Sequence, residues 1–250
     1  RPACRMPAEP KAGGKPTVSV PVAVTADDVR AILHTPSLLA LVAQPIVDTR
    51  RAVITGYEVL TRFTLDVRRG PDVVFAEAAA MGLGPALEAL VIEKALTLWR
   101  TMPPNCFLTI NVDPAHLLSP EVDALLMAEA TLSGIVLELT EHRLIENVAM
   151  LVAVLDRLRK RGALIAVDDA GSGYSGLRRI LEIRPQFVKL DRELVAHVHE
   201  DDAKRALVQM LGELAGRLDA WLIAEGIETE AELRVLVQLG VPLAQGYYLA

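Results

Sequence analysis

Short apolar runs alternate along the chain with longer segments in which apolar residues recur every three or four positions. The short runs predict strands at 106–112, 135–139, 164–167, 187–190, 221–224 and 241–244. The longer segments predict helices at 121–130, 145–161, 202–218 and 230–239. Strands that alternate with helices in this way are typical of βα units and of a parallel sheet.

The N-terminal part breaks this alternation. Two further strands, at 41–47 and 53–61, are joined only by residues 48–52, which are too few for a crossover helix, so we expect an antiparallel pair. Helices within 71–81 and 85–100 then lead to the strand at 106–112, which gives eight strands in all. The predicted fold class is α/β: a modified TIM (β/α)8 barrel over residues 25–250, with one antiparallel strand near the N-terminus. A doubly wound open sheet is the alternative, but no glycine-rich phosphate loop follows the first strand.

Length and composition fit one such barrel. The chain has 250 residues, of which 52% are apolar, enough for a single large core. Residues 1–24 are rich in proline, glycine and lysine and show no helical period, so we expect a flexible leader or linker. The chain begins with Arg1 and stops at Ala250, directly after the last predicted strand. We therefore expect a piece of a longer protein that ends before a final closing helix, with regulatory domains upstream.

Charge and cysteine content indicate which kind of partner the protein binds and where in the cell it is located. A net charge of −6 gives no basic surface for a nucleic-acid polymer, so a small ligand is the expected partner. No apolar stretch approaches the length of a membrane-spanning helix, and the first residues lack the apolar segment of a signal peptide. Cys4 and Cys106 form no disulfide or metal-ligand pattern, which indicates a reducing cytoplasm as the location.

A pair of acidic residues, Asp168 and Asp169, directly follows the apolar run 163–167 and opens a glycine-containing turn. Adjacent carboxylates repel each other unless a cation or a proton relieves them, and carboxylate oxygens suit hard divalent ions. Taken alone, the pair fits an ordinary solvated turn equally well.

Other polar residues also lie in or just after the apolar runs, where the carboxyl ends of barrel strands carry chemistry. The complete set is Glu58, Asn111, Glu138, Asp168, Asp169, Lys189, Glu225 and Gln245. For Asn111 or Gln245 alone, an interior polar group satisfied by its neighbours is an equal alternative. Together, so many carboxylates at one barrel mouth require divalent cations, and oxygen ligands favour Mg²⁺ or Mn²⁺ over Zn²⁺.

Two metal ions with a carboxylate base and a lysine are suited to hydrolysing a phosphodiester. Arg62, four residues after Glu58, is a candidate for a substrate phosphate, with a surface salt bridge as the competing interpretation. His197 and His199 receive no role, since we expect them on a solvated helix end or loop. Ser172 and Ser175 have no histidine base nearby in the sequence, which argues against a serine nucleophile.

These motifs resemble the EAL family of cyclic di-GMP phosphodiesterases, from about Gln44 to the end of the chain. The matching segments are QPIV at 44–47, GYEVLTR at 56–62, NV at 111–112, ELTE at 138–141, DDAGSGYS at 168–175, KLD at 189–191, AEGIET at 224–229 and QGY at 245–247. The resemblance implies a (β/α)8 barrel with one antiparallel strand. It also implies a homodimer that hydrolyses cyclic di-GMP to linear pGpG in bacterial signalling.

The resemblance also implies a role for each site residue. Glu58, Asn111, Glu138 and Asp168 would bind a first Mg²⁺ or Mn²⁺ ion, and Asp168 and Asp169 a second. Lys189 would position an attacking water or a second-site ligand, and Glu225 would be a general base or a partner of the metal site, so that Glu225, Lys189 and Glu58 form the catalytic set. Gln44, Arg62 and Gln245 would contact substrate, and Glu141 would anchor the loop after Asp169, which in this family couples dimer contacts to metal occupancy.

Three positions depart from the family pattern. Val59 replaces alanine, Ser172 replaces threonine and Ala170 replaces phenylalanine. Val59 should be tolerated because neighbouring side chains on a strand point to opposite faces, and Ser172 keeps a hydroxyl. The lost aromatic at Ala170 removes packing from the loop. A non-catalytic module for cyclic di-GMP binding or dimerisation is therefore the alternative function.

Overall fold

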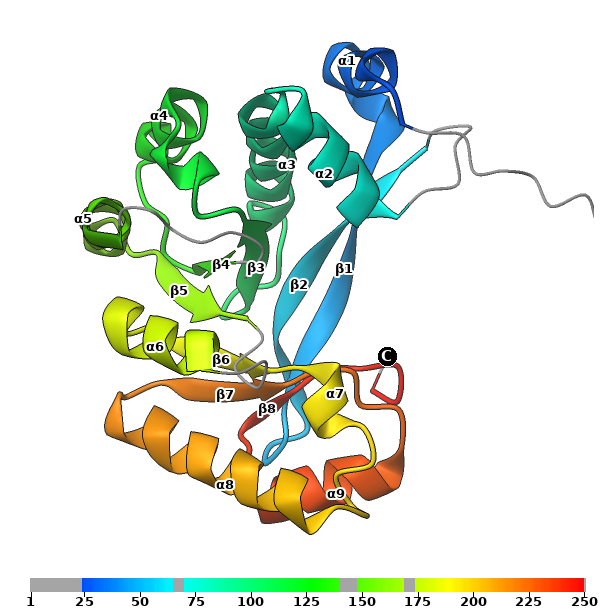
Figure 1. Ribbon diagram of the computed structural model, residues 1–250, viewed down its shortest axis with the longest axis vertical. Coiled ribbons are helices and arrows are strands. Elements are labelled where there is room, and N and C mark those ends of the chain that lie inside the picture. The colour runs from blue at the N-terminus through cyan, green and yellow to red at the C-terminus, as the bar shows by residue number, and fades with distance from the viewer. Residues whose placement is uncertain (1–23, 65–69, 140–147, 169–173, 250) are drawn as a thin grey trace, which may run out of the picture.

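The fold is a closed barrel of eight strands in sequential order, surrounded by helices (Figure 1). A computed structural model of the chain describes residues 24–64, 70–139, 148–168 and 174–249. The strands are β1 (Leu39–Asp48), β2 (Val53–Phe63), β3 (Phe107–Val112), β4 (Ile135–Leu139), β5 (Leu164–Val167), β6 (Phe187–Leu190), β7 (Trp221–Ala224) and β8 (Leu243–Ala244). Because β1 is antiparallel to both β2 and β8 while the other neighbouring pairs are parallel, the predicted modified TIM barrel is confirmed.

The helices largely follow the expected ranges. They are α1 (Ala26–His34), α2 (Pro71–Ala80), α3 (Gly84–Trp99), α4 (Pro120–Ala128), α5 (Val148–Lys160), α6 (Tyr174–Ile183), α7 (Arg192–Val195), α8 (Asp202–Arg217) and α9 (Glu230–Gln238). Short 3-10 helices lie at Pro36–Leu38 and His116–Leu118. Helices α1, α6 and α7 were not predicted. The four residues of α7 are too few to show a period, whereas α1 and α6 are about as long as the predicted α4 and α9 and carry apolar residues at helical spacing, so their signal was available. Of the expected leader, residues 1–23 lie outside the described part of the chain.

Two apolar layers flank the strands. Outward-facing residues such as Val59, Leu137 and Val188 pack with the surrounding helices in the main core. Val59 is 3% exposed and packs in that core, whereas Glu58 hydrogen-bonds to Asn111 of the next strand. The expected alternation of these two side chains is thus confirmed.

The inner layer closes the interior of the barrel below its mouth. It contains Ile46, Val136, Ala166, Phe187, Ile223 and Leu243, with Phe107 packed against it. Gly56 is needed here, since a Cβ atom at this position would come within 2.5 Å of the Phe107 ring. Several inner apolar residues are followed two positions later by a predicted site residue, as Val136 is by Glu138 and Ile223 by Glu225. The two-residue period of a strand therefore directs these polar side chains into the same interior, one layer higher.

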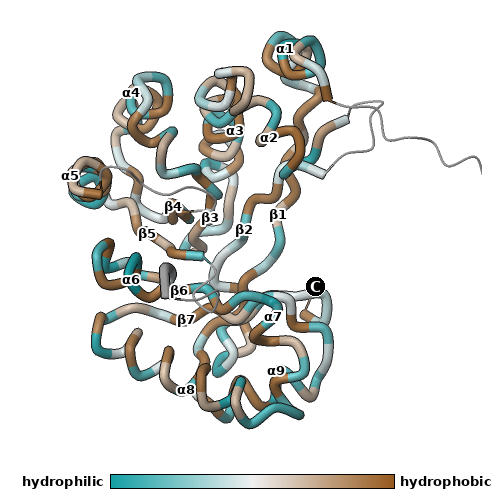
Figure 2. Tube along the Cα trace, viewed as in Figure 1, coloured by the Kyte–Doolittle hydropathy of each residue, from teal (hydrophilic) through white to brown (hydrophobic). Residues whose placement is uncertain are grey.

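The outer helices bury one face each. On α8 the buried residues Val208, Leu211 and Ala215 recur every three or four positions, and the tube in Figure 2 alternates accordingly between hydrophobic and hydrophilic colours along this helix. Across the described ranges, no helix combines the length and the apolarity that crossing a membrane requires.

Helix α9 depends on a buried carboxylate at its start. Glu232 is 4% exposed and accepts hydrogen bonds from the backbone N–H groups of His197, Glu228 and Thr229, each at 3.0 Å. Thr229 completes a capping box by accepting from the Glu232 N–H. We expect Glu232→Ala to lower the free energy of unfolding by about 1–3 kcal/mol in urea denaturation, because three N–H groups lose their acceptor.

Glu230 supplies the matched control for this prediction, because it lies on the same helix and pairs with Arg234 at 2.6 Å in an exposed setting. Glu230→Ala should change stability by less than about 0.5 kcal/mol. Equal losses in the two variants would show that the buried carboxylate has no special role.

Candidate functional site

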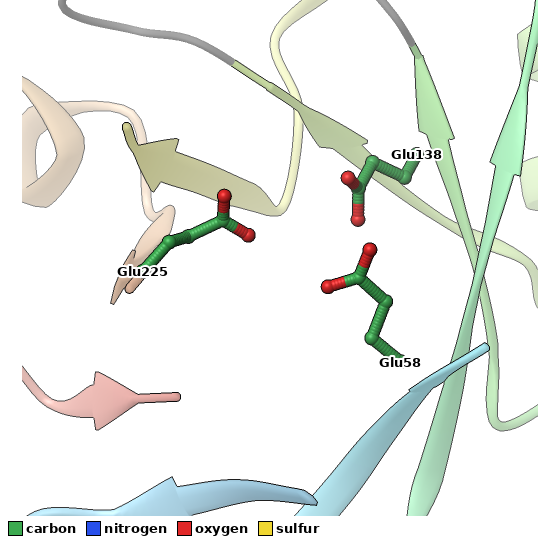
Figure 3. Close-up of side chains that lie close together, drawn as sticks. All are labelled: Glu58, Glu138 and Glu225. Carbon is green, nitrogen blue, oxygen red and sulfur yellow. The ribbon is translucent and has the colours of Figure 1, made fainter. Parts of the chain in front are cut away.

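Polar side chains from successive strands converge at the carboxyl end of the barrel. Glu58 comes from β2, Asn111 from β3, Glu138 from β4 and Lys189 from β6, while Glu225 and Gln245 directly follow β7 and β8. Figure 3 shows the carboxylates of Glu58, Glu138 and Glu225 directed toward a common space. Residues that are more than 160 positions apart in sequence, such as Glu58 and Glu225, are thereby brought together.

Lys189 lies at the centre of this cluster and is only 1% exposed. Its Nζ atom lies 2.5 Å from Glu138 Oε1 and 3.2 Å from Glu58 Oε2, and it also forms an ion pair with Glu225. An unpaired ammonium group in such a place would be very costly. The three surrounding carboxylates explain why the lysine pKa is raised even though burial acts to lower it.

Glu58 accepts hydrogen bonds from side chains at the ends of two other strands, β3 and β8. Asn111 Nδ2 donates to its Oε1 at 2.9 Å, and Gln245 Nε2 donates to its Oε2 at 2.5 Å. Burial acts to raise the pKa of Glu58, but the attraction of Lys189 and these hydrogen bonds outweigh burial, and the pKa is lowered. Glu58 is therefore held as a carboxylate.

The other two glutamates behave differently. Burial raises the pKa of Glu225 to about 8; Lys189 acts against this shift, and the charges of Asp168 and Glu58 add to it. Burial likewise raises the pKa of Glu138 well above its usual value, again opposed by Lys189. One lysine thus does not compensate the whole cluster, and Glu225, whose pKa of about 8 lies above neutral pH, holds a proton there unless a further cation is present.

The residues present fit a hard divalent cation. One oxygen each from Glu58, Glu138 and Glu225 lie within 4.8 Å of one another, and Glu138 Oε2 is buried and has no hydrogen-bond partner among the described residues. A buried oxygen without a donor is costly, and binding a cation would satisfy it. Oxygen donors without imidazole or thiolate suit Mg²⁺ or Mn²⁺.

The acidic pair after β5 is described only in part. Asp168 is half-buried and its charge raises the pKa of both Glu138 and Glu225, so it belongs to the cluster. Asp169, Ala170 and Ser172 lie outside the described residues, as does Glu141. Their expected roles at a second ion and in the loop stay predictions.

A cavity of about 260 Å³ adjoins the cluster, and its lining includes Gln44, Glu58, Glu225 and Gln245. Gln44 and Glu58 face each other in the register of β1 and β2. Arg62 is exposed, donates to the Thr61 carbonyl at 2.9 Å and does not line this cavity. Gln44 and Gln245 line the cavity and Arg62 does not, and contact of any of the three with substrate stays a prediction.

Three polar lining residues were not predicted as site residues: Arg192, Glu228 and Tyr247. Arg192 Nη2 lies 2.6 Å from Glu228 Oε1, and its side chain passes so close to Gly226 that a Cβ atom there would come within 2.6 Å of it. Gly226 also has a φ of +66°, a conformation that favours glycine. Arg192 follows Asp191, which caps α7. Its position just beyond the carboxyl end of β6 is the sequence signal that could have identified it as a site residue.

A cavity of about 210 Å³ at the opposite end of β7 contrasts with this one. Among the residues that the structure describes, its lining, which includes Trp221, Gly212 and Pro242, offers no carboxylate. The two ends of the barrel therefore differ in chemistry, as expected for a fold in which polar groups gather at the carboxyl ends of the strands.

Curated relatives share the sequence over most of this chain. The chain is 29% identical to the probable cyclic di-GMP phosphodiesterase PdeG of Escherichia coli over 217 residues, which cover 82% of this chain and 43% of that protein. It is 33% identical to the probable cyclic di-GMP phosphodiesterase PdeI of the same organism, over 84% of this chain and 28% of the relative. The chain thus spans less than half the length of these relatives.

Solved structures share the fold. An EAL domain protein from Listeria monocytogenes superposes with a TM-score of 0.80 at 20% identity, over 92% of this chain and 94% of that one. Klebsiella pneumoniae BlrP1 in a complex with calcium and cyclic di-GMP gives a TM-score of 0.74 at 30% identity, over 86% of this chain and 56% of that one. The sequence model of the EAL domain family matches residues 29–250, so this chain belongs to the EAL domain family.

Proposed function

We propose that this chain hydrolyses cyclic di-GMP to linear pGpG with the help of two bound Mg²⁺ or Mn²⁺ ions. The observation that carries the proposal is the cluster of Glu58, Glu138 and Glu225 around Lys189, beside a cavity at the mouth of an EAL barrel. The relatives named as probable cyclic di-GMP phosphodiesterases support the substrate. The BlrP1 complexes that contain cyclic di-GMP with calcium or with manganese support the need for a divalent cation.

The residues of the cluster have separable roles in this reaction. Glu58, held as a carboxylate by Asn111, Gln245 and Lys189, is a permanent anionic ligand. Glu225 has a pKa of about 8, so near neutral pH it can exchange a proton with the attacking water as a general base. Lys189, fixed by three carboxylates, holds that water or a phosphate oxygen in place. Bound divalent cations would lower the pKa of the water and neutralise charge that develops on the phosphate.

The bond changes follow from this arrangement. The water oxygen forms a bond to phosphorus, one ester P–O bond of the cyclic dinucleotide breaks, and the proton removed from water is passed toward the leaving 3′ oxygen. Because only one of the two phosphodiesters is cut, the product is linear. A non-catalytic binding module remains the second candidate, and Ala170 in place of the family's phenylalanine is the sequence feature that favours it.

We also propose that the chain forms a homodimer. Met150 on α5 and Leu181 on α6 are 51% and 56% exposed, and apolar side chains on two successive outer helices suit a surface that a second copy covers. Light scattering of the purified chain across a dilution series would test this.

Removal of the Glu58 carboxylate, which accepts hydrogen bonds from Asn111, Lys189 and Gln245, should abolish activity. We expect Glu58→Ala to reduce conversion of cyclic di-GMP to pGpG by more than about 10³-fold, since the ligand is lost and Lys189 is repositioned. The product is measured by chromatography in the presence of Mn²⁺, and circular dichroism checks the fold. Glu93→Ala, at an exposed position of α3, is the control and should leave turnover unchanged. Unchanged turnover in Glu58→Ala would contradict the assigned role of Glu58, and binding without turnover in the unmodified chain would favour the non-catalytic module.

Metal affinity should depend on pH in a defined direction. A cation bound beside Glu225 competes with the proton that Glu225 carries below its pKa of about 8, so affinity rises with pH and levels off above about 8. We expect the apparent Mn²⁺ affinity, measured from the paramagnetic resonance of the free ion, to increase by up to about tenfold between pH 6 and pH 7, the limit for release of one proton.

Glu225→Gln tests the origin of this slope, because the amide does not titrate. Its Mn²⁺ affinity should be lower than that of the unmodified chain, and its dependence on pH should be weaker by about one proton per ion bound. An unchanged slope would assign the proton to another group.

A further inference from the structure

The end of β3 lacks a neighbouring strand on one side just where Asn111 has to be held. The pairing of β2 with β3 ends at Val59 and Ile110, whereas the pairing of β3 with β4 continues to Val112. The Leu108 N–H points toward β4, since it donates to the Gly134 carbonyl. Because N–H directions alternate along a strand, the Asp113 N–H points to the opposite side, where β2 no longer pairs.

Glu88 of α3 takes the place of the missing strand. Its Oε1 accepts a hydrogen bond from the Asp113 N–H at 2.6 Å, and its Oε2 contacts His116 Nδ1. Glu88 is 4% exposed and His116 9%, so this contact is shielded from water. One carboxylate therefore ties the first residue after β3 and the following 3-10 helix to the outer helix.

The contact is also closely packed. The His116 ring rests against the first turn of α3, where a Cβ atom at Gly84 would come within 2.7 Å of the ring. Gly84 and Glu88 are one helical turn apart, and Asp113 and His116 lie three residues apart. The two short segments thus dock onto each other at the level of Asn111.

We propose that Glu88 is a positioning residue, which sets the side chain of Asn111 through the Asp113 amide. Asn111 lies two residues before Asp113, and its Nδ2 reaches Glu58 at 2.9 Å. If the Asp113 amide is released, the end of β3 loses its hydrogen bond to α3, and the Asn111 amide loses its fixed distance to Glu58. As far as the ion is concerned, the inference rests on the proposed function, because Asn111 is a proposed metal ligand.

Two nearly isosteric variants isolate the hydrogen bond. Glu88→Met keeps a straight side chain of similar length but has no acceptor for the Asp113 N–H, whereas Glu88→Gln keeps a carbonyl oxygen and should restore the bond. Leu96→Ala is the stability control, because Leu96 is 1% exposed on the same helix and its truncation loosens the core without touching Glu88. If Glu88→Met does not fold, Glu88→Asp replaces it, since the shorter side chain withdraws the carboxylate from the Asp113 amide.

The first measurement uses the metal-free protein. The side-chain amide of Asn111 is observed by nitrogen-15 NMR and identified by its absence in Asn111→Asp. In Glu88→Met, or in Glu88→Asp, we expect this signal to shift and its hydrogen exchange to accelerate, whereas Glu88→Gln and Leu96→Ala should resemble the unmodified chain. An unchanged Asn111 signal in Glu88→Met, or equal changes in Leu96→Ala, would overturn the proposal.

The second measurement is the dissociation constant for Mn²⁺ alone. It should rise about tenfold or more in Glu88→Met, stay within about threefold in Glu88→Gln, and be unchanged in Leu96→Ala. A rise of the same size in Leu96→Ala would overturn the positioning role. The two proposals fail separately: if the unmodified chain neither binds Mn²⁺ nor cleaves cyclic di-GMP while the Asn111 signal responds as expected, the proposed function is wrong and the positioning role of Glu88 stands.

Discussion

The ion pairs of the buried Lys189 with Glu58, Glu138 and Glu225 are the interaction on which the rest of the site depends. None of these groups would be stable alone at such depth, because an isolated charge in an apolar surrounding is far more costly than one in water. Lys189 and two hydrogen bonds keep Glu58 ionised, whereas at Glu225 burial outweighs the attraction of the lysine and raises the pKa to about 8. Under the proposed function, a bound cation would balance the negative charge that the lysine leaves uncompensated.

The barrel makes this concentration of charge possible. Apolar residues close the interior from below, and the next inward position along several strands is polar. The site is therefore one layer of an otherwise ordinary barrel core, and outward residues such as Val59 bind the same strands to the helices. Because the two apolar layers supply the stability of the fold, the mouth of the barrel can contain carboxylates that repel one another when no cation is bound.

Contacts of the surrounding helices and loops fix the positions of site side chains that strand pairing alone does not fix. Asn111 sits where β3 has lost its pairing with β2, and the Glu88 carboxylate from α3 holds the chain there. On the other side of the mouth, Arg192 pairs with Glu228 and passes close to Gly226, directly after the Glu225 position. Helices and loops around the barrel thus adjust groups whose strands only roughly position them, which is how supporting residues commonly act at metal and catalytic sites.

The sequence by itself determined the strand pattern and most of the polar set. The strands at 135–139, 164–167, 187–190 and 221–224 agree with β4 to β7, because each is an apolar run bounded by polar residues or by glycine and proline. The short connection 48–52 determined the antiparallel pair, since no crossover fits into it. Helices α1 and α6 were not predicted, although their apolar residues recur at helical spacing as they do in the similarly short α4 and α9.

Only the tertiary structure decided which of the polar residues meet and in which charge state. Glu58 and Lys189 are 131 positions apart, and nothing local in the sequence states that the lysine lies between three glutamates or that Glu225 is protonated at neutral pH. The role of Glu88 was likewise not visible in the sequence, where it is one polar residue in an apolar helix. Its hydrogen bond with the Asp113 N–H, 25 positions away, makes it the support of Asn111. Secondary structure and side-chain direction follow from neighbours along the chain, whereas burial, pairing and pKa depend on neighbours in space.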